Sequence, residues 1–141
     1  MSLYLDTSVL VPLFCEEPKS KLVGGWASQA QVPFSVSDFA VAEFCSALSK
    51  CVRIGVFDQA YSQKLISSFD GWRKIHCSFE HIQPADIESA TQLVQQPLPK
   101  LLVPDAVHLA ICQRLELTLV TLDKDLLTIA TREGVTAICP A

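Results

Sequence analysis

The sequence lacks the features that mark membrane proteins, secreted proteins and zinc fingers. No apolar run approaches the roughly 20 residues that span a bilayer, and Asp6 interrupts the first apolar stretch, so the N-terminus does not resemble a secretory signal. The six cysteines include no CxxC pair, and no two of the cysteines and histidines have the spacing of a zinc finger or ribbon. Each cysteine has apolar neighbours, as buried thiols of a reducing compartment do. We therefore expect no membrane span and a cytoplasmic location.

Repeats, low-complexity tracts and linkers are also missing. The chain has 141 residues, of which 50% are hydrophobic and 18% charged. This composition predicts a packed globule, and the length suits one domain better than two. We expect a single domain over residues 1–141.

The apolar pattern alternates between strands and helices. Strands are predicted at 3–5, 32–36, 75–82, 117–121 and 135–139, with helices beginning near residues 8, 20, 37 or 38, 58, 84, 104 and 124. In the helix that Asp58 caps, Tyr61, Leu65, Phe69 and Trp72 have core-facing spacing. Strands separated by helices favour an α/β fold with a parallel sheet covered on both faces.

Two carboxylates directly follow predicted strands. Asp6 comes after the strand at 3–5, and Asp123 comes after the strand at 117–121. If both strands belong to one parallel sheet, the two side chains meet at its carboxyl edge, where ligands bind in open α/β sheets. The alternative is helix capping by each aspartate, with Asp125 favourable in the first turn of the last helix.

Two further carboxylates lie on predicted helices. The residues three and four positions from Glu43 make a small, mostly apolar face, so its partial burial would require a cation or hydrogen bonds. The alternatives for Glu43 are a salt bridge or a solvated position. Asp105 opens an almost wholly apolar helix, where the helix dipole alone could explain it. Four such carboxylates together would call for a hard dication with oxygen ligands.

The net charge of −4 argues at first against a nucleic-acid partner. Removing Asp6, Glu43, Asp105, Asp123 and Asp125 would change the net charge from −4 to +1. Because bound divalent metal would neutralise much of such a cluster, the acidity is compatible with a phosphodiester substrate.

These residues stand in motifs that resemble those of the PIN-domain nucleases, and more closely the VapC-type toxins of toxin–antitoxin pairs. The motifs are Asp6-Thr7-Ser8, Ala42-Glu43, Asp105-Ala106-x-His108-Leu109-Ala110 and Thr121-x-Asp123-x-Asp125. Each motif is weak alone, but the ordered set is specific and covers essentially the whole chain. Leu126 departs from the family, in which an aromatic residue often follows the last motif.

The resemblance implies a three-layer α/β/α sandwich with a parallel sheet of order 3-2-1-4-5. It also implies a metal-dependent ribonuclease, in which Asp6, Glu43, Asp105 and Asp123 hold Mg²⁺ or Mn²⁺ and hydrolysis needs no side-chain nucleophile. Supporting roles fall to Ser8, Thr121 and Asp125. A small antitoxin and a homodimer are family expectations.

Substrate contacts and competing functions complete the sequence-based hypotheses. Lys50 and Arg53, on the Glu43 helix, and Lys124, beside Asp123, are candidates for RNA phosphate contacts. His108 is interpreted as a packing or locally hydrogen-bonded residue. The alternatives are a PIN-like module that binds RNA or protein without cutting, and a metal-dependent phosphatase. The phosphatase pattern requires a second aspartate at position 8, where this chain has serine.

Overall fold

The computed structural model describes residues 2–141 and is built on a five-stranded parallel sheet. Its strands are β1 (Leu3–Leu5), β2 (Phe34–Ser37), β3 (Cys77–Glu80), β4 (Thr118–Val120) and β5 (Ala137–Ile138). They lie in the order β3-β2-β1-β4-β5, and every neighbouring pair is parallel. The predicted order 3-2-1-4-5 is therefore confirmed.

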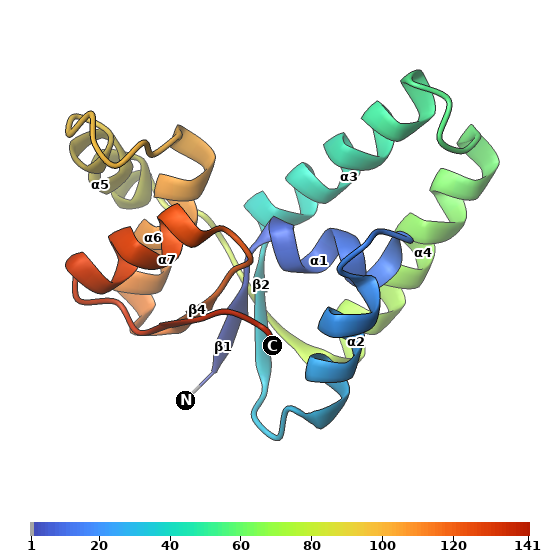
Figure 1. Ribbon diagram of the computed structural model, residues 1–141, viewed down its shortest axis with the longest axis horizontal. Coiled ribbons are helices and arrows are strands. Elements are labelled where there is room, and N and C mark those ends of the chain that lie inside the picture. Colours follow the sequence, from blue (N-terminus) through green and yellow to red (C-terminus); the bar gives the residue numbers. More distant parts are fainter. Residues whose placement is uncertain (1) are drawn as a thin grey trace.

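Seven helices of the described chain cover both faces of the sheet (Figure 1). One face carries α1 (Thr7–Phe14), α2 (Ser20–Gln29), α3 (Asp38–Arg53) and α4 (Gln59–His76). The other carries α5 (Pro84–Leu93), α6 (Val103–Leu115) and α7 (Lys124–Arg132). The resulting three layers are the predicted α/β/α sandwich.

Local signals explain where the helices begin. The side chain of Ser37 accepts the backbone N–H of Ala40 at the start of α3, and Asp58 caps α4 in the same way. Pro84 occupies the first position of α5, where its missing N–H costs nothing. Gly55 follows α3 with a φ of 81°, a conformation that glycine adopts readily.

The core consists of two apolar clusters, one on each face of the sheet. Successive side chains of β1 point to opposite faces, so Leu3 and Leu5 enter the first cluster and Tyr4 enters the second. In α6, every residue from 106 to 112 is buried. This confirms that the all-round apolar helix is an interior one, and it carries Asp105 and His108 into the centre of the molecule.

The structure corrects the third predicted strand. The prediction was 75–82, but Ile75 and His76 belong to α4, and β3 spans only Cys77–Glu80. The side chain of Ile75 is 78% exposed. Helix α4 runs directly into this edge strand, so no turn residue separates the helical pattern from the strand pattern.

A second correction concerns the outer part of α4. Leu65 and Phe69 are buried as predicted, whereas Tyr61 is 48% exposed. Tyr61 lies in the first turn of α4, where the α3–α4 hairpin projects beyond the sheet, and its ring contacts Phe57 (Figure 1). The spacing of apolar residues identifies one face of a helix but does not say how far along that face the core extends.

The cysteines only partly match the expectation of burial. All six are free, and Cys15 and Cys112 are buried, but Cys139 is exposed. In the described part of the chain, no helix is long and apolar enough to cross a membrane.

Candidate active site

The site lies where β1 and β4 end side by side. The two strands pair with Leu5 opposite Val120, and the backbone N–H of Asp6 donates to the carbonyl of Val120 at 3.2 Å. Asp6 and Asp123, which follow the two strands, therefore emerge at the same carboxyl edge of the sheet. The two strands belong to one parallel sheet, which was the condition for the predicted meeting of Asp6 and Asp123.

Asp6 is a buried carboxylate with only 2% of its surface exposed. It stands just before α1, yet its side chain makes no capping hydrogen bond. The Ser8 hydroxyl donates instead to Oδ1 of Asp6 at 2.5 Å. Burial raises the pKa of Asp6, and hydrogen bonds from the hydroxyls of Ser8 and Thr121 partly oppose the rise. The helix-capping alternative for this side chain is wrong.

Ser8 and Thr121 join the two strand ends. The Ser8 hydroxyl accepts the backbone N–H of Leu122 at 3.0 Å and lies 3.4 Å from the Thr121 hydroxyl. Thr121 in turn accepts the N–H of Asp123 at 3.0 Å. The hydroxyls that the resemblance assigned to supporting roles thus fix the turns that carry Asp6 and Asp123.

Asp123 does cap a helix. Its Oδ1 accepts the backbone N–H groups of Asp125 at 2.9 Å and Leu126 at 3.1 Å, at the start of α7. Its Oδ2 accepts no hydrogen bond from residues 2–141, so capping leaves one oxygen available. Asp125 is exposed, and it meets the site through its backbone N–H, which donates to Asp123. Leu126 is buried in the core below α7.

Glu43 reaches the site from α3. Its side chain is 26% exposed, and a single oxygen, Oε1, accepts hydrogen bonds from the Thr7 hydroxyl at 2.7 Å and from Nε2 of His108 at 2.5 Å. Burial alone would raise the pKa of Glu43, but these two partners outweigh it, so the pKa lies below its ordinary value. The partner of Glu43 is thus a buried histidine and not a surface lysine or arginine.

His108 makes more than the local contacts that the sequence suggested. It is 1% exposed, and its Nδ1 lies 2.6 Å from the Tyr4 hydroxyl while Nε2 meets Glu43. Its ring therefore connects α6 with β1 and α3. Sequence reasoning missed Tyr4 and gave no role to Thr7, which appeared only within the Asp6-Thr7-Ser8 motif. A tyrosine inside an apolar strand and a histidine inside an apolar helix each need a buried polar partner, which was the available signal.

Asp105 lies in the first turn of α6, and the charges of the other carboxylates affect its pKa. Its pKa is raised from 3.8 to about 6, first by burial and then by the negative charges of Asp123, Asp6 and, more weakly, Glu43. The other three predicted carboxylates are therefore close enough to act on Asp105.

The donor set suits a hard cation, although it is not drawn together around one point. Within residues 2–141, no three His, Cys, Asp or Glu side chains form a group that could hold a metal ion as they stand. Carboxylates that repel one another are expected to spread until a cation neutralises them. All four are oxygen donors, which Mg²⁺ and Mn²⁺ prefer to nitrogen or sulfur.

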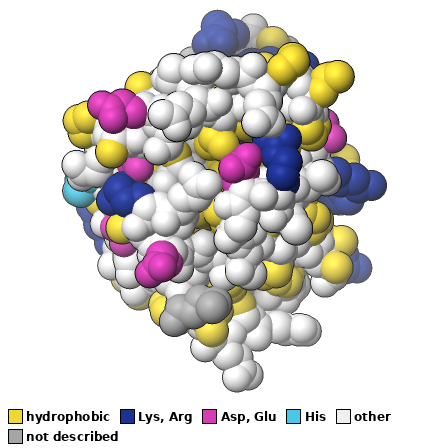
Figure 2. Space-filling model, turned by 90° about the vertical axis from the view of Figure 1, so that its left-hand side faces the viewer, with side chains coloured by type: hydrophobic (Ala, Val, Ile, Leu, Met, Phe, Trp, Pro, Cys, Tyr) yellow, Lys and Arg dark blue, Asp and Glu magenta, His cyan; other side chains and the backbone are white. Residues whose placement is uncertain are grey.

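Two of the three predicted phosphate contacts share a hollow with Glu43. This hollow has a volume of 310 Å³ and is lined by residues of α1 and α3, namely Thr7, Glu43, Ser46, Ala47, Lys50 and Arg53. Lys124 is exposed next to Asp123, at the start of α7. The opposite side of the molecule, covered by α5–α7, shows acidic and basic side chains interspersed without a continuous basic patch (Figure 2).

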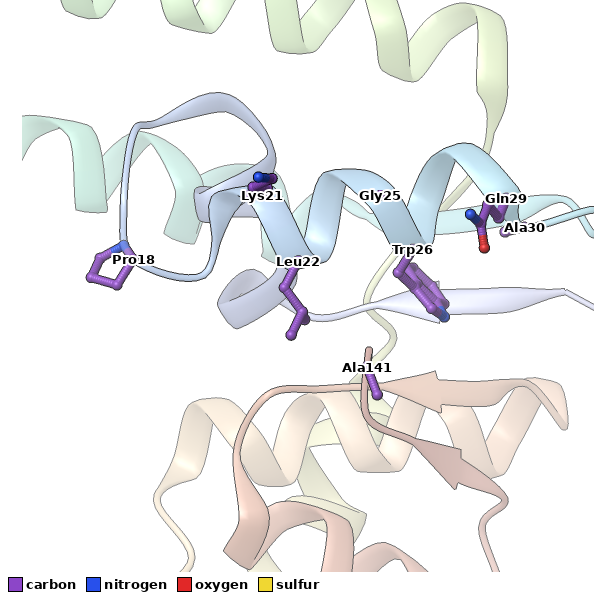
Figure 3. Close-up of a pocket in the computed structure, with 8 residues that line it drawn as sticks. All are labelled: Pro18, Lys21, Leu22, Gly25, Trp26, Gln29, Ala30 and Ala141. Atoms are coloured by element: carbon purple, nitrogen blue, oxygen red, sulfur yellow. The ribbon is translucent and has the colours of Figure 1, made fainter.

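A second hollow, of 610 Å³, is lined by residues of a different chemical character from the carboxylates of the sheet edge. Leu22 and Trp26 point from α2 toward Ala141, and Lys21 is the charged side chain among the residues lining it (Figure 3). It contains no acidic side chain. We therefore assign the functional site to the sheet edge and not to this hollow.

Comparisons with known proteins identify the family and the fold. The family model described as "PIN domain" matches residues 3–131. No individual curated protein matches the sequence significantly. Among solved structures, the chain is similar to VapC20 of Mycobacterium tuberculosis, described as a sarcin-ricin loop cleaving toxin, with 14% identity, coverage of 95% of this chain and 96% of that one, and a TM-score of 0.73.

Two further solved structures are similar to the same extent. VapBC2 of Rickettsia felis, bound to a DNA fragment from its promoter, has 15% identity, 99% and 98% coverage and a TM-score of 0.71. FitAcB of Neisseria gonorrhoeae has 16% identity, 98% and 97% coverage and a TM-score of 0.71. At such identities the structural likeness establishes the fold alone. Since the family model covers nearly the whole sequence, the chain belongs to the PIN-domain family.

Proposed function

We propose that this protein is a divalent-metal-dependent endoribonuclease that hydrolyses RNA phosphodiester bonds. The observation that carries the proposal is that the negative charges of Asp6, Glu43 and Asp123, which come from separate parts of the chain, act on Asp105, while Asp6 and Asp123 follow two paired strands. No lysine or arginine within residues 2–141 forms an ion pair with any of them. A negative cluster without a protein counterion is what a cation-binding site requires.

The carboxylates have distinct tasks in this proposal. Asp6, Glu43, Asp105 and Asp123 would hold Mg²⁺ or Mn²⁺, which when bound supplies positive charge beside the scissile phosphate and makes water a better nucleophile. Oε1 of Glu43 and Oδ1 of Asp123 already accept hydrogen bonds, so their second oxygens would be the ones free to bind the cation. Either Glu43 or Asp123 could accept the proton of the attacking water.

Lys50 and Arg53 supply the positive charge that an RNA backbone needs. Both line the hollow that begins at Glu43. We propose that a strand of RNA lies along α3 so that phosphates next to the scissile one meet these two side chains, with Lys124 as a further contact beside Asp123. In this arrangement the cationic residues position the RNA, and the carboxylates act on it.

The experiment combines RNA, metal and chelator. Purified protein is expected to cleave single-stranded RNA with Mg²⁺ or Mn²⁺, and EDTA should abolish the cleavage. Asp6→Asn preserves shape while removing a buried charge, and it should lower the cleavage rate at least about tenfold. Glu88→Gln removes an exposed carboxylate of α5 and should leave the rate unchanged. Undiminished cleavage by Asp6→Asn, or cleavage that ignores EDTA, would contradict the proposal.

The toxin role is the finer part of the proposal. A solved structure of similar fold from Klebsiella pneumoniae is described as a toxin–antitoxin complex. We propose that this chain likewise pairs with a small antitoxin, which masks the site, and that it forms a homodimer. Co-expression with the product of an adjacent small gene tests the pairing, since a true antitoxin should co-purify with the nuclease and suppress RNA cleavage.

A further inference from the structure

A buried line of hydrogen bonds ends on Glu43. Starting at α3, the backbone N–H of Ala40 meets Ser37 Oγ at 3.0 Å, and Ser37 Oγ lies 2.7 Å from the Tyr4 hydroxyl. The Tyr4 hydroxyl lies 2.6 Å from His108 Nδ1, and His108 Nε2 lies 2.5 Å from Glu43 Oε1. Ser37, Tyr4 and His108 are each 1% exposed or less.

Counting donors and acceptors shows which group donates and which accepts at each contact of this line. The Ala40 N–H can only donate, so Ser37 Oγ is an acceptor there. Ser37 is wholly buried, and its other described partner is Tyr4, so its hydroxyl hydrogen must go to the Tyr4 oxygen. Tyr4 then donates its own hydrogen to His108 Nδ1. The remaining ring hydrogen of His108 is therefore on Nε2, where it is donated to the Glu43 carboxylate.

The opposite direction leaves a group unpaired. A hydrogen on His108 Nδ1 would be donated to Tyr4, and Tyr4 would then donate to Ser37. The hydroxyl hydrogen of Ser37 would have no acceptor among residues 2–141. A buried donor without a partner is strongly disfavoured, so the first direction satisfies every group and the second does not. Burial also raises the pKa of Tyr4 well above its ordinary value, which keeps the phenol a donor.

We propose that His108 is a positioning residue for Glu43, held by Tyr4 in the tautomer with hydrogen on Nε2, so that the second oxygen of Glu43 would be left free to bind a cation. This role rests on the proposed function, because it matters only if Glu43 is a metal ligand. Two donors, His108 and Thr7, hold the same oxygen Oε1, and Oε2 accepts no hydrogen bond within the described chain. Such a pair of contacts prevents the carboxylate from rotating.

The tautomer can be measured without metal, RNA or activity. In an ¹⁵N-labelled protein, long-range ¹H–¹⁵N spectra report which ring nitrogen of each histidine carries hydrogen. We expect His108 to show a protonated Nε2 and an unprotonated Nδ1, with its signals assigned by their loss in His108→Gln. His76 and His81 are exposed and serve as references in the same spectrum. A hydrogen on Nδ1 of His108 would overturn the proposal.

Manganese binding tests the positioning role separately. His108→Leu removes the donor to Glu43 and should weaken Mn²⁺ binding by about tenfold or more, as outer contacts of metal ligands do. The amide of His108→Gln can still donate to Glu43, so this variant should restore affinity to within about threefold of the original protein. Circular dichroism and thermal unfolding identify any variant that fails to fold. If His108→Leu does not fold, the Mn²⁺ affinity of His108→Gln is compared directly with that of the original protein.

The two proposals fail in different ways. If His108→Leu folds and binds Mn²⁺ as tightly as the original protein, the positioning role is wrong even though the metal site stands. If the original protein binds no Mn²⁺, the proposed function and the positioning role both fail, whereas the ring spectra still decide the hydrogen-bond direction.

Discussion

Replacing Asp105 by asparagine should stabilise the metal-free protein at neutral pH. The pKa of Asp105 is raised from 3.8 to about 6 by burial and by the charges of Asp123 and Asp6. Between about pH 4 and pH 6, the folded protein therefore holds a proton that the unfolded chain has already released. Folding stability falls as the pH rises through this window, and the full loss is present above pH 6.

The size of the effect follows from the two pKa values. A gap from 3.8 to about 6 corresponds, at about 1.4 kcal/mol for each pKa unit, to about 3 kcal/mol. Asparagine removes this penalty but also loses the favourable interaction of a charge with the start of α6, worth roughly 0.5 kcal/mol. Partial exposure of Asp105 screens the remainder. We expect a net gain of about 2 kcal/mol at pH 7.5, which raises the melting temperature by roughly 4–8 °C.

The assay is thermal and urea unfolding in EDTA at pH 4 and at pH 7.5. Asp105→Asn should match the original protein at pH 4 and exceed it at pH 7.5, while the matched surface variant Glu88→Gln should differ at neither pH. Added Mn²⁺ should stabilise the original protein and narrow the difference. A variant that is no more stable at pH 7.5 would refute the argument that Asp105 is held in a negative, partly buried cluster.

Three further predictions concern packing and substrate binding. Arg114→Met should destabilise the fold by about 3 kcal/mol in urea unfolding, because Arg114 Nε and Nη2 pair with the buried Asp86 at 2.8 and 3.0 Å; unchanged stability would mean that this pair contributes nothing. Ser8→Ala should cost about 1–2 kcal/mol, since one hydroxyl serves both a buried carboxylate and a backbone N–H, and a melting temperature equal to that of the original protein would contradict this. Lys50→Ala and Arg53→Ala should weaken RNA binding and lower the slope of log K against log salt by about one each, with Mn²⁺ affinity unchanged. An unaltered slope would remove these side chains from the RNA path.

Much of the fold was readable from short stretches of sequence. The alternation of strands and helices, the caps at Ser37 and Asp58 and the proline that opens α5 depend on residues within a few positions of one another. The ends of β3 and the exposure of Tyr61 were not readable, because they depend on where the α3–α4 hairpin leaves the sheet. Local patterns do not contain that information.

The same division applies to the site. The sequence by itself determined which residues were unusual: acids after strands, and Glu43 on an apolar helix face. Only the tertiary structure decided that Asp123 caps a helix while Asp6 does not, and that His108 bonds to Tyr4 and Glu43, residues 104 and 65 positions away. The physical reason is that a buried polar group must be paired, but any sufficiently close group can pair with it, and closeness is a property of the folded chain.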